Sequence, residues 1–171
     1  IQQEMNNITA LSNETCQLGI QSRNMVLYIA KKDSPQPIRL MSSVGKQLPL
    51  YCTGLGRALL AYKSEEEIRN LFPEVLTAYT PHTIATINDL LKELELTRQR
   101  GYAVEHEETN LMVNCIAVSL DYNNAPIAAL SISIPTFRIS ESKEKEAVQI
   151  LWEAKQRIET HFKMYGVDFG N

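Results

Sequence analysis

The sequence predicts an α+β domain built on a sheet of about six, mostly antiparallel strands that is flanked by helices. Short apolar runs with a period of two are joined by hairpin-length connections at residues 21–24 and 121–126. Segments with helical periodicity lie between these runs, and a long one follows the last of them. A length of 171 residues, 44% of them hydrophobic, suits one domain whose core can enclose a small cavity.

The N-terminal part combines a helix with a strand meander. The chain opens at Ile1, and residues 1–12 carry apolar side chains at helical spacing, so we expect the end of a linker helix that enters from a preceding segment. Residues 15–32 form two β-rich runs around the polar turn, and residues 37–44 (PIRLMSSV) predict a third strand.

Three capped helices are expected next. Thr53 is placed to cap a helix that begins near Gly54, and Ser64 begins a second helix with a capping box. Thr86 opens a third helix, which stops at Gly101 because glycine favours the left-handed conformation that ends helices.

The C-terminal part returns to strands and ends in a long helix. Residues 102–108 alternate as a strand, and residues 115–135 form two strands closed by Pro135. A long helix is predicted from Ser140 onward. Its apolar face consists of Ala147, Ile150, Leu151, Ala154, Ile158 and Phe162.

The composition excludes several classes of function. The net charge is −3 and the cations are scattered, so we expect no DNA binding by this chain itself. No apolar run approaches the roughly 20 residues that a membrane helix needs, which predicts a soluble domain. Cys16, Cys52 and Cys115 form neither a disulfide framework nor a CxxC half-site, as is typical of a reducing cytoplasm. Zinc-helix spacings and nucleotide fingerprints are missing, so no metal or cofactor is expected.

Two hydroxyls interrupt the last apolar strand. Side chains alternate along a strand, so Ser131 and Ser133 share one face with Ala129. This small, polar face either packs closely under a helix, with its hydroxyls satisfied by the backbone, or forms the floor of a pocket for a polar ligand. The residues alone leave both interpretations open.

Two further features are compatible with a ligand. The TGLG turn at residues 53–56 can present backbone N–H groups to an anion at a helix start, although such turns usually mean only tight packing. In the acidic strand, alternation predicts Glu105 and Glu107 on one face and His106 and Glu108 on the other. This acidic strand is either a solvated edge or places the Glu105 carboxyl where it accepts hydrogen bonds from ligand hydroxyls.

Only one arrangement would suit an enzyme. Cys115, with His106 as a base, could act as a nucleophile. A thiol inside an apolar strand is, however, more often a small buried hydrophobe than a thiolate.

Several blocks together resemble the effector-binding domain of IclR-type bacterial transcriptional regulators. These blocks are LPLYCTGLGRALLAY, YTPHTIATINDLLKEL, RQRGYAVEHEE, NCIAVSL and AALSISIPTFRIS, in this order and over nearly the whole chain. The resemblance implies a GAF-like fold and a cytoplasmic regulator whose N-terminal winged helix-turn-helix lies outside this chain. Residues 1–12 would then end the linker helix, and residues 13–171 would form the effector-binding domain, which assembles as a homodimer or tetramer and meets operator DNA only through the N-terminal domain.

The resemblance also implies a site for a small carboxylate. Carried over by motif, the effector-binding residues are Gly54, Leu55, Glu105, Cys115, Ser131, Ser133 and Leu40. Glu105 stands where aspartate is usual, and Ile134 and Met112 replace common glycines. The SISIPTFRISE segment is most similar to regulators of 2-keto-3-deoxygluconate use, which favours a sugar acid over a smaller 2-keto acid.

The resulting hypothesis is a sensing and oligomerisation domain of a regulator, a repressor of carbon catabolism, that binds a sugar acid or 2-keto acid. The alternatives are a purely structural dimerisation domain and a Cys-dependent enzyme acting on small acids. In the leading hypothesis no residue is catalytic.

Overall fold

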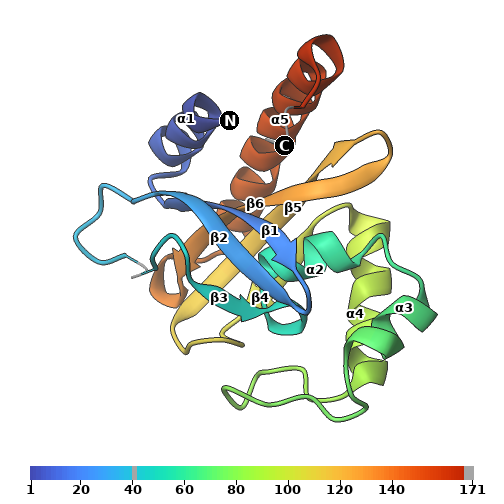
Figure 1. Ribbon diagram of the computed structural model, residues 1–171. Helices are drawn as coiled ribbons and strands as arrows, with labels where there is room; N and C mark the ends of the chain where they lie inside the picture. Colours follow the sequence, from blue (N-terminus) through green and yellow to red (C-terminus); the bar gives the residue numbers. More distant parts are fainter. Residues whose placement is uncertain (40–41, 168–171) are drawn as a thin grey trace.

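A single antiparallel sheet curls through the centre of the molecule, as Figure 1 shows for the computed structural model, which describes residues 1–39 and 42–167. Its strands lie in the order β3-β2-β1-β6-β5-β4, so the first and last long strands are neighbours at the centre. The strands are β1 (Thr15–Ser22), β2 (Met25–Lys32), β3 (Gln47–Pro49), β4 (Ala103–His106), β5 (Val113–Tyr122) and β6 (Ala125–Pro135).

Helices cover both faces of the sheet. Helices α1 and α5 pack on one face, and α2, backed by α3 and α4, packs on the other (Figure 1). The helices are α1 (Gln2–Ser12), α2 (Gly54–Leu60), α3 (Glu65–Leu71), α4 (Ile87–Arg100) and α5 (Glu141–Tyr165), with short 3₁₀ turns η1 (Leu50–Cys52) and η2 (Thr136–Arg138). The predicted α+β class is confirmed.

Side-chain caps start four of the helices where the sequence predicts them. The Thr53 hydroxyl accepts the N–H of Gly56 at the start of α2, and Ser64 forms its capping box with Glu67 at the start of α3. Thr86 and Ser140 cap α4 and α5 in the same way. Each cap satisfies an N–H group that has no acceptor within its helix.

A turn and a register shift set the pairing of the β5–β6 hairpin. Asn123 and Asn124, between β5 and β6, have φ values of 52° and 61°, the left-handed conformation that a type I′ turn requires at both positions. This turn pairs Tyr122 with Ala125, and a one-residue shift of register between Leu120 and Asp121 then brings Cys115 opposite Ser133.

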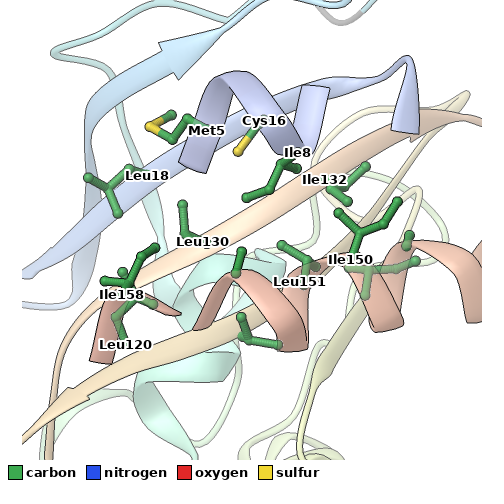
Figure 2. Close-up of a cluster of buried hydrophobic side chains, with 14 of the residues drawn as sticks. Met5, Ile8, Cys16, Leu18, Leu120, Leu130, Ile132, Ile150, Leu151 and Ile158 are labelled. Carbon is green, nitrogen blue, oxygen red and sulfur yellow. The ribbon is translucent and has the colours of Figure 1, made fainter. Parts of the chain in front are cut away.

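The face under α1 and α5 is filled by large apolar side chains. Leu130 and Ile132 of β6 are fully buried there against Leu151 and Ile158 of α5 and Ile8 of α1 (Figure 2). Every apolar position predicted for the inner face of α5 is buried. Hydrophobic burial on this face anchors both terminal helices to the sheet.

The face under α2 carries small side chains instead. Ala117 and Ala129 lie beneath the helix, and a Cβ atom at Gly54 would stand 3.3 Å from the Cβ of Cys115. A Cβ atom at Gly56 would stand 2.2 Å from the carbonyl oxygen of Leu50, closer than any side chain permits. Gly54 therefore lets α2 lie close to β5, which is part of the close packing that the small strand residues predict, and Gly56 lets α2 pack against η1.

Two strand predictions are wrong. Residues 37–39 and 42–44 form no strand, because Pro35 and Pro37 have no backbone N–H to donate and Gly45 turns the chain with a φ of 86°. The third strand is instead the short β3 at Gln47–Pro49. The strand predicted over residues 102–108 ends at His106, since Glu107 has a φ of 54° and turns the chain away.

We expect Leu130→Ala to lower the free energy of unfolding by roughly 2–5 kcal/mol, because a fully buried leucine leaves a cavity between sheet and α5. Urea unfolding at equilibrium measures this value. Leu96→Ala, at a half-exposed position of α4, is the matched control and should cost less than about 1 kcal/mol. Equal losses for the two variants would contradict the core assignment.

Candidate functional site

Polar side chains gather on the sheet face under α2, in two neighbouring rows that the strand register sets. Ser131 and Ser133 point to this face while Leu130 and Ile132 point to the other, as alternation predicts. One row runs across β4, β5, β6 and β1 as Glu105, Cys115, Ser133 and Thr15, and the next contains Ala117, Ser131 and Gln17.

The hydroxyls of the floor are bonded to a side chain that sequence reasoning missed. Ser133 donates to Oε1 of Gln17 at 2.8 Å, and Ser131 donates to the same oxygen at 3.2 Å. The Sγ of Cys115 lies 3.1 Å from the hydroxyl of Ser133. Gln17 was detectable as the polar residue in the middle of the apolar run of the first strand, two positions from Thr15 and Gly19 on the same face.

The start of α2 lies directly above this floor. Gly54 and Leu55 occupy the first turn of the helix, where N–H groups have no intrahelical acceptor, and the Thr53 hydroxyl already holds the N–H of Gly56. Their place against Cys115 brings backbone donors to the same spot as the polar rows.

A small cavity of about 30 Å³, which we call the cup, lies between this floor and the segments that cover it. We call these segments the roof: the start of α2 and the connection between β2 and β3, which contains Ser42 and Lys46. Five of the predicted site residues line the cup, whereas Ser133 lies beneath it and Leu40 lies outside the described residues. The lining residues are Gln17, Tyr28, Ser42, Lys46, Leu48, Thr53, Gly54, Leu55, Glu105, Thr109, Asn110, Val113, Cys115 and Ser131.

A larger hollow of about 320 Å³ lies elsewhere, between α2, α4 and β5. It includes Ala58, Tyr62 and Arg98 but none of the predicted site residues. We favour the cup as the site because its polar groups converge from β1, β2, β4, β5, β6, the start of α2 and two connecting segments. Convergent polar groups rather than volume give a pocket its specificity.

Glu105 is buried at the inner wall of the cup. Its Oε1 accepts the N–H of Glu108 at 2.5 Å and that of Thr109 at 3.3 Å. Burial raises the pKa of the Glu105 carboxyl to about 7, and the nearby charge of Glu108 acts in the same direction. Near neutral pH this carboxyl can therefore either accept or donate a hydrogen bond.

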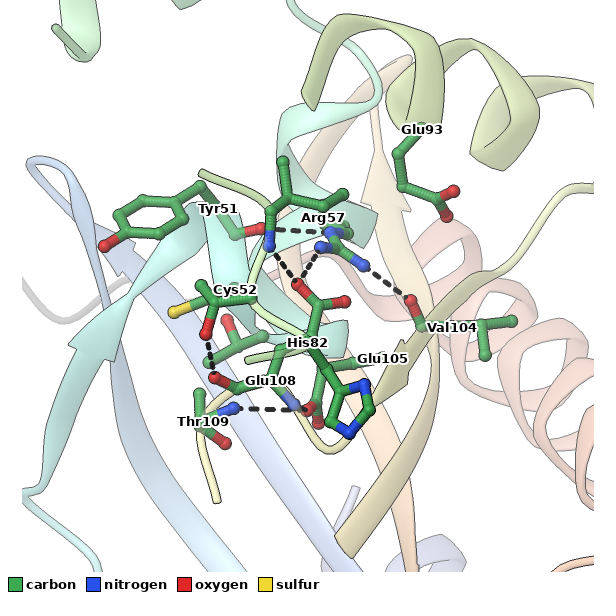
Figure 3. A network of polar contacts seen from close by, with 12 residues as sticks. Tyr51, Cys52, Arg57, His82, Glu93, Val104, Glu105, Glu108 and Thr109 are labelled. Carbon is green, nitrogen blue, oxygen red and sulfur yellow. Dashed lines mark hydrogen bonds and ion pairs between the residues drawn. The ribbon is translucent and has the colours of Figure 1, made fainter. Parts of the chain in front are cut away.

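Behind Glu105 lies a buried ion pair, shown in Figure 3. Nη2 of Arg57 donates to Oε2 of Glu108 at 2.5 Å, and its other nitrogens donate to the carbonyls of Tyr51 and Val104. The prediction that Glu108 faces away from Glu105 is wrong. Both point inward, because the turn at Glu107 breaks the alternation, and Glu107 accepts the N–H of Met112 outside the cup.

The arrangement that an enzyme would need is not formed. Cys115 lies opposite Glu105 in the β4–β5 pair, whereas His106 lies opposite Asn114 on the other face and has Nδ1 2.9 Å from Oδ1 of Asn114. Burial, together with the charge of Glu105, raises the pKa of the Cys115 thiol well above its usual range. A thiolate nucleophile is disfavoured at this position.

In residues 1–39 and 42–167, no three His, Cys, Asp or Glu side chains gather closely enough to hold a metal ion. Over the same residues, none of the helices combines the length and the apolar character needed to cross a membrane.

Comparison with known proteins identifies the family of the chain. The family model described as "Bacterial transcriptional regulator IclR C-terminal" matches residues 1–160. The HTH-type transcriptional regulator KdgR of Dickeya chrysanthemi is 38% identical over 157 residues, which cover 91% of this chain and 52% of that protein. The chain thus spans about half the length of this relative.

Solved structures agree with the sequence comparison. The C-terminal domain of Escherichia coli KdgR superposes with a TM-score of 0.85 at 33% identity, covering 97% of this chain and 96% of that one. An IclR homolog from Microbacterium hydrocarbonoxydans, solved in complex with 4-hydroxybenzoate, has the same fold, with a TM-score of 0.84 at 24% identity, and covers 95% of this chain and 66% of that one.

The raised pKa of Glu105 predicts a pH dependence of stability. Its pKa lies at about 7 in the folded state against an ordinary value of 4.5, so its stabilising contribution is complete below 4.5 and is lost as the pH rises through 7. We expect the free energy of unfolding of the wild type to fall by roughly 2 kcal/mol relative to Glu105→Gln between about pH 5 and about pH 8, measured by urea unfolding.

Glu107→Gln is the control for this measurement. Hydrogen bonds from the Met112 N–H and the Thr136 hydroxyl lower the pKa of Glu107, so this carboxyl titrates below the tested range. The control should show the same fall as the wild type. A fall of equal size in Glu105→Gln would show that another group is responsible.

The three thiols should react slowly in the folded protein. Burial raises the pKa of Cys16 and Cys52 to about 12 and that of Cys115 well above its usual range. We expect iodoacetamide at about pH 8 to modify each of them more than about 100-fold more slowly than in urea, as measured by peptide mass spectrometry. Rapid native alkylation of Cys115 would revive the thiol-enzyme alternative.

Proposed function

The chain belongs to the IclR C-terminal family of bacterial transcriptional regulators, and on this premise we propose that its cup binds a small carboxylate metabolite, a hydroxylated sugar acid in preference to a plain 2-keto acid. The carboxylate would meet the first-turn amides of α2, those of Gly54 and Leu55, above Ser131 and Cys115. Charge-assisted hydrogen bonds to backbone N–H groups would fix its orientation.

The observation that carries this proposal is the convergence of the predicted site residues on one cavity. Glu105 from β4, Cys115 from β5, Ser131 from β6 and the start of α2 line the same 30 Å³ hollow. Packing alone explains the small size of these residues under the helix, but it does not account for a carboxyl, a thiol and a hydroxyl placed side by side.

The choice of a sugar acid rests on the number of polar groups around the cup. Gln17, Ser42, Thr109 and Asn110 add side-chain donors and acceptors to those of Glu105. A hydroxylated sugar acid could form hydrogen bonds with more of these groups than a small 2-keto acid could. The similarity to KdgR and the carboxylate bound to the Microbacterium homolog are compatible with this class of ligand.

Regulation would follow from a shift between arrangements of the assembled protein. A ligand changes DNA affinity only if it prefers one of those arrangements. The first strand, β1, carries Gln17 at the cup and follows directly on α1, the predicted end of the linker helix. We propose that a homodimer or tetramer transmits the change through α1 to a DNA-binding domain that precedes it in the full-length regulator.

A thermal-shift screen of sugar acids and small 2-keto acids tests the binding proposal. A ligand that binds only the native state raises its stability by RT ln(1+[L]/Kd), so a true effector at about 100 times its Kd should add roughly 2.7 kcal/mol. If no carboxylate shifts the melting temperature, a structural dimerisation domain becomes the better account. Recovery of the ligand unchanged, followed by NMR, separates binding from turnover.

We expect the double variant Ser131→Ala/Ser133→Ala to weaken sugar-acid binding by about tenfold or more while leaving the fold intact, because it removes two hydroxyls from the floor. Isothermal titration calorimetry measures the change in Kd. Ser119→Ala is the control, since Ser119 lies on the same sheet face but outside the cup. Unchanged affinity in the double variant would remove the serines from the site.

A further inference from the structure

We propose that Gln17 is the specificity-determining residue of the cup: its side-chain amide, which holds floor and roof together, exchanges these partners for the hydroxyl groups of the ligand. This inference rests on the proposed function, because it assumes that the cup binds an acid. It adds a residue from β1 to the predicted site and a reason for the cup to prefer hydroxylated ligands.

The position of Gln17 gives it contacts on both sides of the cup. Its side chain is buried, and its Oε1 accepts hydrogen bonds from Ser131 and Ser133 on the floor. Its Nε2 donates to the hydroxyl of Ser42 in the roof at 2.7 Å. One side-chain amide therefore connects β6 to the connection between β2 and β3.

A second bond fixes the same piece of roof. Nζ of Lys31 donates to the carbonyl oxygen of Ser42 at 2.6 Å, so Ser42 is held by two side chains from neighbouring strands. Lys46, further along the same connection, also lines the cup. Opening the cup on this side requires the bond between Gln17 and Ser42 to break.

The volume of the cup makes such an opening necessary. A cavity of about 30 Å³ holds no more than a few water molecules, since one water needs roughly 10–15 Å³. A sugar acid is several times larger. Its entry must therefore displace the Gln17 amide from the serine hydroxyls, which become free to bond the ligand.

This exchange favours ligands with hydroxyl groups. An amide carries both donors and acceptors, and so does a hydroxyl, so each can satisfy the other. An acid without hydroxyls would leave the displaced Gln17 amide buried and unpaired, which costs affinity. The chemical class that fits is a hydroxylated 2-keto or aldonic acid.

The test compares two acids that differ only in their hydroxyl groups: 2-keto-3-deoxygluconate and 2-ketohexanoate, which have carbon chains of equal length. The ratio of their Kd values, measured by calorimetry, is the readout, because a general loss of stability moves both values alike. We expect Gln17→Met to reduce the preference for the hydroxylated acid by about tenfold, because the hydroxylated acid loses a hydrogen-bond partner and 2-ketohexanoate no longer leaves a buried amide unpaired.

A control variant separates specificity from packing. Gln21→Met replaces a half-buried glutamine of the same strand that lies outside the cup and bonds the carbonyl of Arg23, so it should keep the wild-type ratio within about threefold. Should Gln17→Met fail to fold, Gln17→Asn carries the test, because its shorter amide keeps the site polar without the same reach, and the ratio should still fall.

The outcomes distinguish this inference from the proposed function. If the wild type binds the hydroxylated acid and Gln17→Met keeps the wild-type ratio, the inference is wrong and the proposed function stands. If the wild type binds neither acid nor any other carboxylate, the proposed function fails and the inference fails with it.

Discussion

The close approach of α2 to the sheet is the constraint on which the cup depends. The helix lies close to the strands because Ala117 lies beneath it and because Gly54 has no Cβ atom to meet Cys115, while Gly56 allows the backbone of Leu50 in η1 to pack against the helix. Once the helix is seated this way, its first turn faces the polar rows of β5 and β6 rather than solvent. Close packing under the helix, one of the two alternatives that the sequence presents for Ser131 and Ser133, is therefore present, and the polar rows adjoin it on the same face.

Burial of charge under the cup follows from the same packing. Arg57 of α2 is enclosed with its ion-pair partner Glu108, and the backbone N–H of Glu108 in turn donates to Glu105. Paired charges with satisfied donors are tolerated in an interior, whereas an isolated carboxylate is not. In residues 1–39 and 42–167, Glu105 has backbone donors but no ion pair, and its pKa rises because burial disfavours its charged form and the nearby charge of Glu108 adds to this effect.

Local features of the sequence were sufficient to predict most of the elements. The caps at Thr53 and Ser64 and the apolar face of α5 are encoded within a few residues, and each is confirmed. The errors arise where local pattern and tertiary context differ. Glu107 has a left-handed conformation that strand alternation does not predict. The hydrogen-bond partners of Gln17 are serines more than a hundred residues away in the sequence. Leu40 lies outside the described residues, so its assignment stays a prediction.

The strand order has a consequence for the folding of the chain during its synthesis. The cup joins β1 to β6, two strands from opposite ends of the sequence that become neighbours only when the sheet closes. Contacts of such long sequence separation form late, after the loop between them has been ordered. A nascent chain that has emerged only as far as β5 would lack both floor serines. Under the proposed function, a ligand would therefore find a complete cup only after synthesis of the last strand, and it would assist only the final step of folding.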